Sequence, residues 1–146
     1  MDSRLKFSIV TCTWNSAATL HDTIASVQAQ DYPDIEHIFV DGGSTDATLD
    51  MITYMCPTAR VLRNVPGGIS RAMNAGIEAA TGDVIAHLHS DDYYVAPDVL
   101  SMVSGALAGG AQWAYGKISL LRDSTPFVPP YSFRSFTYAL YAARGG

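Results

Sequence analysis

Apolar runs of strand length alternate with segments of helical periodicity along the first 110 residues. Four runs predict β-strands, at 7–13, 35–40, 60–63 and 84–88. Between and after them, apolar residues recur every three or four positions, which predicts four helices. The predicted core-facing stripes are Leu20, Ile24 and Val27; Leu49, Ile52 and Met55; Ile69, Ala72, Met73, Ile77 and Ala80; and Leu100, Val103 and Leu107. This alternation is typical of an α/β fold with a mostly parallel, Rossmann-like sheet and helices on both faces.

Polar and special residues mark the expected helix ends. Asn15 or Ser16 is placed to cap the first helix, and Pro97 begins the last. Gly82 follows the third helix, where a left-handed C-cap favours glycine. The pattern changes after residue 110: residues 113–121 predict a further strand, whereas 133–143 is aromatic and weakly helical.

Polar clusters follow three of the predicted strands. Two adjacent carboxylates, Asp91 and Asp92, come just past the end of the run 84–88, which we interpret as the central strand. The carboxyl ends of parallel strands share one edge of a sheet, where ligands bind. The three clusters are Thr13-Trp14-Asn15, Asp41-Gly42-Gly43-Ser44 and Ser90-Asp91-Asp92.

The chemistry of these clusters suits a nucleoside diphosphate. Neighbouring carboxylates repel each other, and Mg²⁺ or Mn²⁺ would relieve that repulsion while bridging to phosphates. Trp14 can stack on a base, and Asp41 can accept hydrogen bonds from a base or a ribose. For Asp91 and Asp92 alone, a solvated acidic turn before the next helix would be the simpler interpretation.

Composition narrows the class of protein. The chain has 146 residues, enough for one domain with a core, and a formal net charge of −5 with two lysines, which argues against nucleic-acid binding. Cys12 and Cys56 fit no metal-ligand spacing and are expected to be free thiols in a reducing compartment. No apolar run approaches the ~20 residues of a membrane-spanning helix, so we expect a cytoplasmic protein.

The common phosphate-binding motifs are missing. Gly116-Lys117 is the one Gly-Lys pair, but Ala111 and Ile118 stand where a P-loop needs glycine and Ser or Thr. A dinucleotide fingerprint of three spaced glycines is also absent from the sequence.

Four sequence blocks together resemble family 2 glycosyltransferases, and their order and spacing match from residue 5 to about residue 122. The blocks are Phe7 to Asn15, ending in Thr-Trp-Asn; Val40-Asp41-Gly42-Gly43-Ser44-Thr45-Asp46; Gly68-Ile69-Ser70-Arg71-Ala72-Met73-Asn74-Ala75-Gly76; and Ala80-Thr81-Gly82-Asp83, leading to Ser90-Asp91-Asp92.

The resemblance implies a GT-A fold, with a nucleotide-sugar-binding domain at 1–122 and the incomplete start of an acceptor-binding region at 123–146. It implies metal-dependent, inverting transfer of a sugar from a UDP- or GDP-sugar to a glycan or lipid-linked acceptor, as in polysaccharide or cell-wall biosynthesis. Residues 90–92 match the family's DXD motif, so that Asp92 and Asp91 would act in catalysis and bind Mn²⁺ or Mg²⁺. The implied substrate-binding residues are Cys12, Thr13, Trp14, Asn15, Asp41, Gly42, Gly68, Arg71, Asn74, His89 and Ser90.

Two departures from the family pattern matter. Gly42 replaces a second acid that would contact the base. An inverting transfer also needs a general base for the acceptor. After Asp92, however, the chain has two acids, Asp98 at a helix start and Asp123 in a loop, of which Asp123 is the better placed. The alternative function is therefore a nucleotide-sugar-binding fragment or inactive remnant without transfer activity.

Other residues allow two interpretations. His87 is expected to be a hydrogen-bonded core residue, whereas His89 lies nearer the site and can be a donor-sugar contact. Four aromatic residues near the C-terminus form either a peripheral contact with the inner face of the membrane or core packing, and their exposure would favour homo-oligomers. They are Phe133, Phe136, Tyr138 and Tyr141.

A third class of protein, a response-regulator-like signalling domain, would need a lysine near the last strand. Lys117 is available, but the four matched blocks argue against this class.

Overall fold

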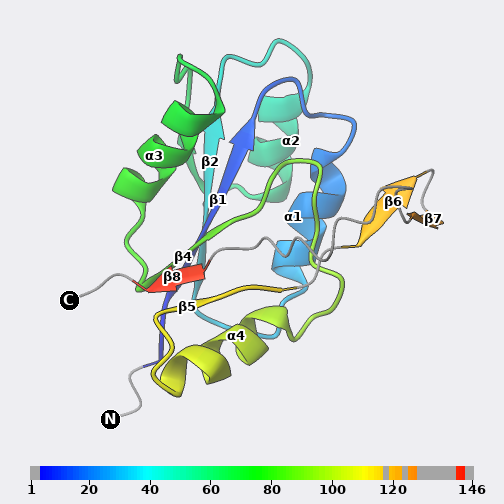
Figure 1. The fold of residues 1–146 in the computed structure, drawn as a ribbon. Coiled ribbons are helices and arrows are strands. Elements are labelled where there is room, and N and C mark those ends of the chain that lie inside the picture. The colour runs from blue at the N-terminus through cyan, green and yellow to red at the C-terminus, as the bar shows by residue number, and fades with distance from the viewer. Residues whose placement is uncertain (1–3, 117–118, 123–124, 128–140, 144–146) are drawn as a thin grey trace.

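A computed structural model describes residues 4–116, 119–122, 125–127 and 141–143 (Figure 1). Strands and helices alternate from the N-terminus to α4, as the sequence pattern predicts. The elements are β1 (Phe7–Thr13), α1 (Leu20–Gln28), β2 (Ile35–Asp41), α2 (Thr48–Met55), β3 (Arg60–Leu62), α3 (Ile69–Ala79), β4 (Val84–His87), α4 (Val99–Ala108), β5 (Trp113–Ala114), β6 (Leu120–Arg122), β7 (Thr125–Phe127) and β8 (Tyr141–Ala143).

The main sheet has the order β3-β2-β1-β4-β8-β5, and its first four strands are parallel. The registers place Thr13 beside Asp41 and Val10 beside His87, so β4 ends earlier along the sheet than β1 and β2 do. β8 pairs antiparallel with β4 and β5. Residues 141–143, which follow the predicted boundary at 122, therefore belong to the same sheet as β1–β4.

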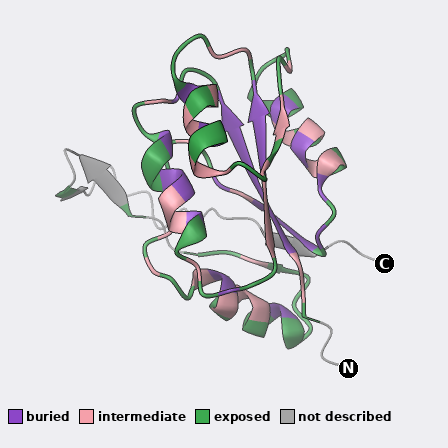
Figure 2. Ribbon diagram, turned by 180° about the vertical axis from the view of Figure 1, so that it is seen from behind, coloured by how far each residue is buried: buried purple, intermediate pink, exposed green. Residues whose placement is uncertain are grey.

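Helices cover both faces of the sheet because neighbouring residues of a strand point to opposite sides. Phe7 and Ile9 pack on the face covered by α1 and α4, whereas Val10 and Cys12 pack on the face covered by α3 (Figure 1). All seven residues of β1 are buried, which makes it the centre of the core (Figure 2). The predicted α/β fold with a parallel sheet is thus confirmed.

Two details of the predicted helices are wrong. Neither Asn15 nor Ser16 caps α1 through its side chain: Thr19 is at the N-cap, and the Ser16 carbonyl accepts the first turn's N–H groups. Ile69, the first residue of α3, is 53% exposed instead of core-facing. Ala72 and Ala80 are buried as predicted.

The predicted left-handed C-cap at Gly82 is also wrong. The extended residue Ala80 ends α3, and Gly82 has no positive φ. Steric crowding accounts for the glycine at position 82, since a Cβ here would lie 2.6 Å from both the Lys6 carbonyl oxygen and Ser8 Oγ. Gly82 therefore allows the chain that leads into β4 to pass close to the start of β1.

The segment after α4 differs from the prediction of one strand at 113–121. β5 belongs to the main sheet, whereas β6 pairs with β7 in a separate two-stranded sheet. Of the predicted weak helix at 133–143, the described part is the strand β8; Phe133, Phe136 and Tyr138 lie outside the described residues. Within the described ranges, no helix has the length and apolar character needed to cross a membrane.

Candidate functional site

The ends of β1 and β2 are joined through Asp41, which is fully buried. Its Oδ1 accepts hydrogen bonds from Thr13 Oγ1 (2.9 Å) and Ser44 Oγ (2.5 Å). Its Oδ2 accepts from the backbone N–H groups of Gly43 (2.9 Å) and Ser44 (2.8 Å). Burial by itself raises the pKa of Asp41, but these hydrogen bonds outweigh it and hold the pKa below its usual range.

Asp41 therefore organises the turn after β2. Two hydrogen bonds on each oxygen fill the acceptor sites of a carboxylate. The direct contact between Asp41 and a nucleoside that the sequence suggests stays a prediction. The neighbouring Gly42 lines the hollow described below.

Asn15 ties the loop after β1 to the loop after β2. Its Oδ1 accepts from the N–H of Thr45 (2.8 Å), and its own N–H donates to Ser44 Oγ (2.9 Å). Asn15 has a φ of 49°, a left-handed conformation that asparagine tolerates better than most residues do. These contacts hold the adjacent Trp14 at the strand ends, where it is 70% exposed.

The acid pair, Asp91 and Asp92, lies in a tight turn after β4. The N–H of Asp92 donates to the carbonyl oxygen of His89 (3.0 Å), and both acids are exposed residues. Partial burial raises the pKa of Asp92, the charge of Asp91 raises it further, and His89 opposes this rise. Two neighbouring like charges favour the approach of a cation.

A strand-end hollow of about 430 Å³ connects these loops. Six predicted site residues line it: Cys12, Thr13, Trp14, Gly42, Gly68 and Ser90. Six further lining residues were not predicted: Ser16, Val65, Pro66, Gly67, Ile69 and Ala72. The segment 65–68 follows the predicted strand 60–63. Because ligands bind at the carboxyl ends of parallel strands, the position of this segment in the sequence also indicates that it lies at the site.

The hollow and the acid pair meet at Ser90. Its hydroxyl is hydrogen-bonded to the hydroxyl of Ser16 (2.9 Å), and both residues line the hollow. Ser90 also directly precedes Asp91 in the chain. A ligand in the hollow therefore lies beside the turn that carries the acids.

Other predicted residues lie around the hollow without lining it. Arg71 and Asn74 are exposed on α3, and His89 is exposed in the turn. The stem of Arg71 lies over Gly67, since a Cβ on that glycine would be 2.3 Å from Arg71 Cδ. Gly67 has a φ of 102°, so both backbone shape and space require glycine there.

Burial favours the neutral forms of Cys12 and His87. Burial raises the pKa of the Cys12 thiol to about 11, so it contributes an uncharged wall to the hollow. Burial, and then the charge of His89, lowers the pKa of His87. The prediction of a hydrogen-bonded His87 is not met at Nδ1, which is inaccessible and has no hydrogen-bond partner in the described part of the chain.

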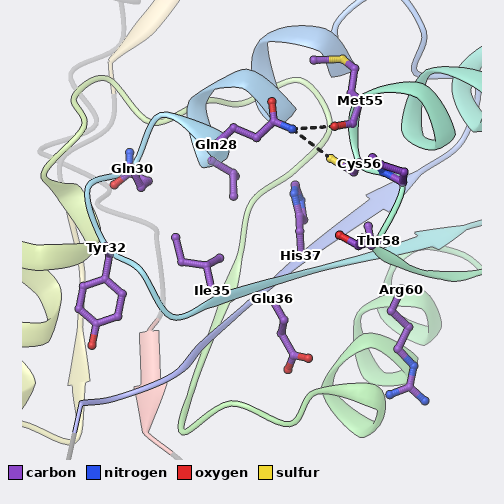
Figure 3. Close-up of a pocket in the computed structure, with 13 residues that line it drawn as sticks. Gln28, Gln30, Tyr32, Ile35, Glu36, His37, Met55, Cys56, Thr58 and Arg60 are labelled. Atoms are coloured by element: carbon purple, nitrogen blue, oxygen red, sulfur yellow. Dashed lines mark hydrogen bonds between the residues drawn. The ribbon is translucent and has the colours of Figure 1, made fainter.

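A second hollow, of about 580 Å³, lies at the opposite end of β2, around Ile35, Glu36 and His37 (Figure 3). Glu36 and His37 point to opposite sides of the strand, and the Glu36 carboxylate accepts from Ser8 and Thr81. At the rim, Gln28 donates to the Met55 carbonyl oxygen (2.7 Å). This hollow is at the amino ends of the parallel strands, whereas the strand-end hollow is at their carboxyl ends and includes Ser90, which directly precedes the acid pair. We therefore place the candidate site at the strand-end hollow.

The acid pair fits a divalent cation that keeps part of its coordination for a substrate. Among the described residues, no group of three or more His, Cys, Asp or Glu side chains could hold a metal by itself. Nor does any described Lys or Arg form an ion pair with Asp91 or Asp92. Mg²⁺ and Mn²⁺ sites that use one or two carboxylates are usually completed by water and phosphate oxygens.

Solved structures share this fold. TarS 1-349 of S. aureus matches with a TM-score of 0.69 at 25% identity, over 88% of this chain and 40% of that chain. The mannosyltransferase PcManGT from Pyrobaculum calidifontis, solved in complex with GDP-Man and Mn²⁺, matches with a TM-score of 0.68 at 24% identity, over 73% of this chain and 33% of that chain. The fold is therefore that of a GT-A glycosyltransferase.

The family follows from sequence. The profile of glycosyl transferase family 2 matches residues 8–144. An uncharacterized glycosyltransferase of Mycobacterium tuberculosis is 36% identical over 143 residues, which cover 93% of this chain and 55% of the relative. This chain belongs to glycosyl transferase family 2, as its sequence blocks indicate. It spans about half the length of the first curated relatives that it matches.

Proposed function

We propose that this chain binds a nucleoside-diphosphate sugar, a UDP- or GDP-sugar, as the donor-binding part of a metal-dependent, inverting glycosyltransferase. The acceptor would be a glycan or a lipid-linked sugar. One observation carries the proposal: Ser90 both lines the strand-end hollow and precedes the acid pair. A nucleoside in the hollow would thus place its diphosphate next to Asp91 and Asp92.

The described residues divide the binding tasks. Trp14 offers an exposed indole for stacking against a base, and the neutral Cys12 forms an apolar wall. Gly42 leaves space where a side chain would enter the hollow. Arg71, whose stem lies over Gly67 at the rim, is placed to meet a diphosphate.

Asp91 and Asp92 would hold Mn²⁺ or Mg²⁺ through carboxylate oxygens. When bound, such a cation stabilises the negative charge that develops on a diphosphate leaving group. The chain's own contribution is to hold the two carboxylates together, although burial and the neighbouring charge make ionisation of Asp92 less favourable. His89, exposed in the same turn, would face the donor sugar.

A second candidate function is donor binding without transfer. Asp98, the described acid that follows the acid pair, is the N-cap residue of α4 and does not line the hollow. Asp123, the other candidate for the general base, lies outside the described residues. Comparing donor turnover with and without added acceptor would separate transfer from binding alone.

A matched pair of variants tests donor binding. We expect Asp92→Asn to abolish the part of UDP or GDP binding that depends on Mn²⁺, and Asp98→Asn to leave it unchanged. Calorimetry on folded protein measures both. Unchanged metal dependence in Asp92→Asn would show that the acid pair is not the metal site.

A further inference from the structure

One side of α1, together with its N-cap residue and the residue that follows its C-cap, is polar and is hydrogen-bonded to the chain around the acid pair. Four side chains make up this polar face, spaced four, three and four residues apart, which places them on one side of a helix. They are Thr19, Thr23, Ser26 and Gln30. Each forms a hydrogen bond with a backbone group of residues 90–96, about 70 positions further along the chain.

The first two side chains hold the turn that contains the acids. Thr19 Oγ1 donates to the carbonyl oxygen of Ser90 (2.8 Å). Thr23 Oγ1 donates to the carbonyl oxygen of Asp92 (2.7 Å), and Thr23 itself is fully buried. A threonine within a helix commonly bonds to its own helix backbone, so these outward bonds are specific to the packed turn.

The next two side chains continue the same pattern. Ser26 Oγ accepts from the N–H of Tyr94 (3.1 Å), and Gln30 Nε2 donates to the carbonyl oxygen of Ala96 (2.8 Å). Gln30 Oε1 also accepts from the N–H of Leu100 at the start of α4 (3.1 Å). The bonds thus run without a break from the acid turn to the next helix.

The partners on the two segments follow one another in order. Along α1 the polar side chains recur every three or four residues, close to one helical turn. Their partners on the segment lie two residues apart, at 90, 92, 94 and 96. The intervening residues Asp91, Tyr93 and Val95 are exposed.

We propose that the polar face of α1 holds residues 90–96 in the conformation that metal–diphosphate binding needs, and that Thr23 is the main positioning residue. This inference rests on the proposed function. A segment that is already ordered loses less conformational entropy when a ligand binds, so its affinity for the ligand is higher. Thr23 acts through the backbone of Asp92 and need not touch the donor.

The first test compares two Thr→Val substitutions of equal size. Thr23→Val removes the bond to Asp92, whereas the control Thr53→Val removes an exposed hydroxyl that bonds to Leu49 within α2. With Mn²⁺ and UDP or GDP, whichever the unmodified chain binds, we expect at least a tenfold loss of affinity in Thr23→Val and less than twofold in Thr53→Val. Thr23→Ser, which keeps the hydroxyl, should restore most of the loss. Equal affinities in all four proteins would overturn the proposal.

A second variant separates positioning from general stability. Gln30→Leu breaks the far end of the pattern, at Ala96 and Leu100, away from the acids. We expect it to lower the melting temperature about as much as Thr23→Val does, but to reduce metal-dependent affinity less than threefold. If affinity falls in proportion to stability in both variants, the positioning role is overturned.

Amide hydrogen exchange tests the ordering without any ligand. The N–H groups of Asp92 and Tyr94 should exchange at least tenfold faster in Thr23→Val than in Thr53→Val, because both lie in the segment that the polar face holds. Unchanged exchange would overturn the inference even if nucleotide binds. Faster exchange in a protein that binds no nucleotide would overturn the proposed function and the link to donor binding, leaving only the structural role.

Discussion

Thr13 and Asp41, the last residues of β1 and β2, lie side by side in the sheet and are joined by a hydrogen bond of 2.9 Å between Thr13 Oγ1 and Asp41 Oδ1. Three further donors from Gly43 and Ser44 complete the environment of the carboxylate. One buried acid therefore fixes two of the loops that form the strand-end hollow.

The first prediction concerns Asp41→Asn. The amide would direct its NH₂ group toward donors that now face a carboxylate oxygen, leaving buried groups unpaired. We expect a loss of about 3 kcal/mol in the free energy of unfolding, measured by urea denaturation. Asp34→Asn, at an exposed acid, is the control and should cost less than about 0.5 kcal/mol. A stable Asp41→Asn protein that has lost only nucleotide binding would instead show that Asp41 contacts the donor.

The second prediction compares two helical glycines. A Cβ on Gly76 in α3 would lie 2.3 Å from Val10 Cγ1, whereas a Cβ on Gly105 in α4 has no neighbour within 4 Å. Overpacking outweighs the gain in helix propensity at Gly76, so Gly76→Ala should cost about 2 kcal/mol. Gly105→Ala should stabilise the protein by about 0.5–1 kcal/mol. The same sign for both variants in denaturant unfolding would contradict the packing of α3 on β1.

The third prediction concerns pH. Burial lowers the pKa of His37 to about 3, compared with about 6.5 in the unfolded chain. Below pH 6.5 the unfolded state takes up a proton that the folded state does not, so stability is lost as the pH falls toward 3. The slope approaches about 1.4 kcal/mol per pH unit for one such group.

The pH window separates this effect from the acids. Asp41 and Glu36 also have lowered pKa values, but their contributions are lost only as the pH falls through the lower range of carboxylates. Unfolding measured between pH 6.5 and 4.5 should therefore show a flatter pH dependence in His37→Gln than in the unmodified chain. His21→Gln, at an exposed histidine, is the control and should leave the pH dependence of unfolding unchanged. The same unchanged pH dependence in His37→Gln would mean that His37 is not held as a neutral group in the folded protein.

The fourth prediction tests whether a base stacks on Trp14. Trp14→Ala should weaken nucleotide binding about tenfold, because stacking of one base on an aromatic ring contributes roughly 1–3 kcal/mol. Trp14 is 70% exposed, so unfolding should change little. Trp113→Ala, at another exposed tryptophan, should leave the affinity unchanged. Equal losses in the two variants would exclude a specific role for Trp14.

The order of elements was predictable because buried parallel strands leave continuous apolar runs. The end of β1 at Thr13 and the stripe Leu100, Val103 and Leu107 of α4 follow directly from such patterns. Gly82 was misinterpreted because its reason is contact with Lys6 and Ser8, and a sequence pattern does not show how closely two distant segments pass.

The site was predictable in its location more than in its contacts. Trp14, Gly42 and Ser90 each follow a predicted parallel strand, so the sequence predicts that they lie close together at the carboxyl ends of the strands. In the structure all three line one hollow. The saturation of Asp41 by four donors depends on local turn geometry, so its turn-organising role was not visible. The role of the polar face of α1 is not visible in the sequence, because its hydrogen-bond partners lie about 70 residues away along the chain.

The most direct test of the central claim is a calorimetric titration of the chain with UDP, and then GDP, in Mn²⁺ and again in EDTA. A nucleotide that binds in the strand-end hollow and reaches the acid pair through a cation should bind in Mn²⁺ and lose most of its affinity in EDTA. Equal binding in both solutions, or no binding in either, would contradict a metal-dependent donor site at Asp91 and Asp92.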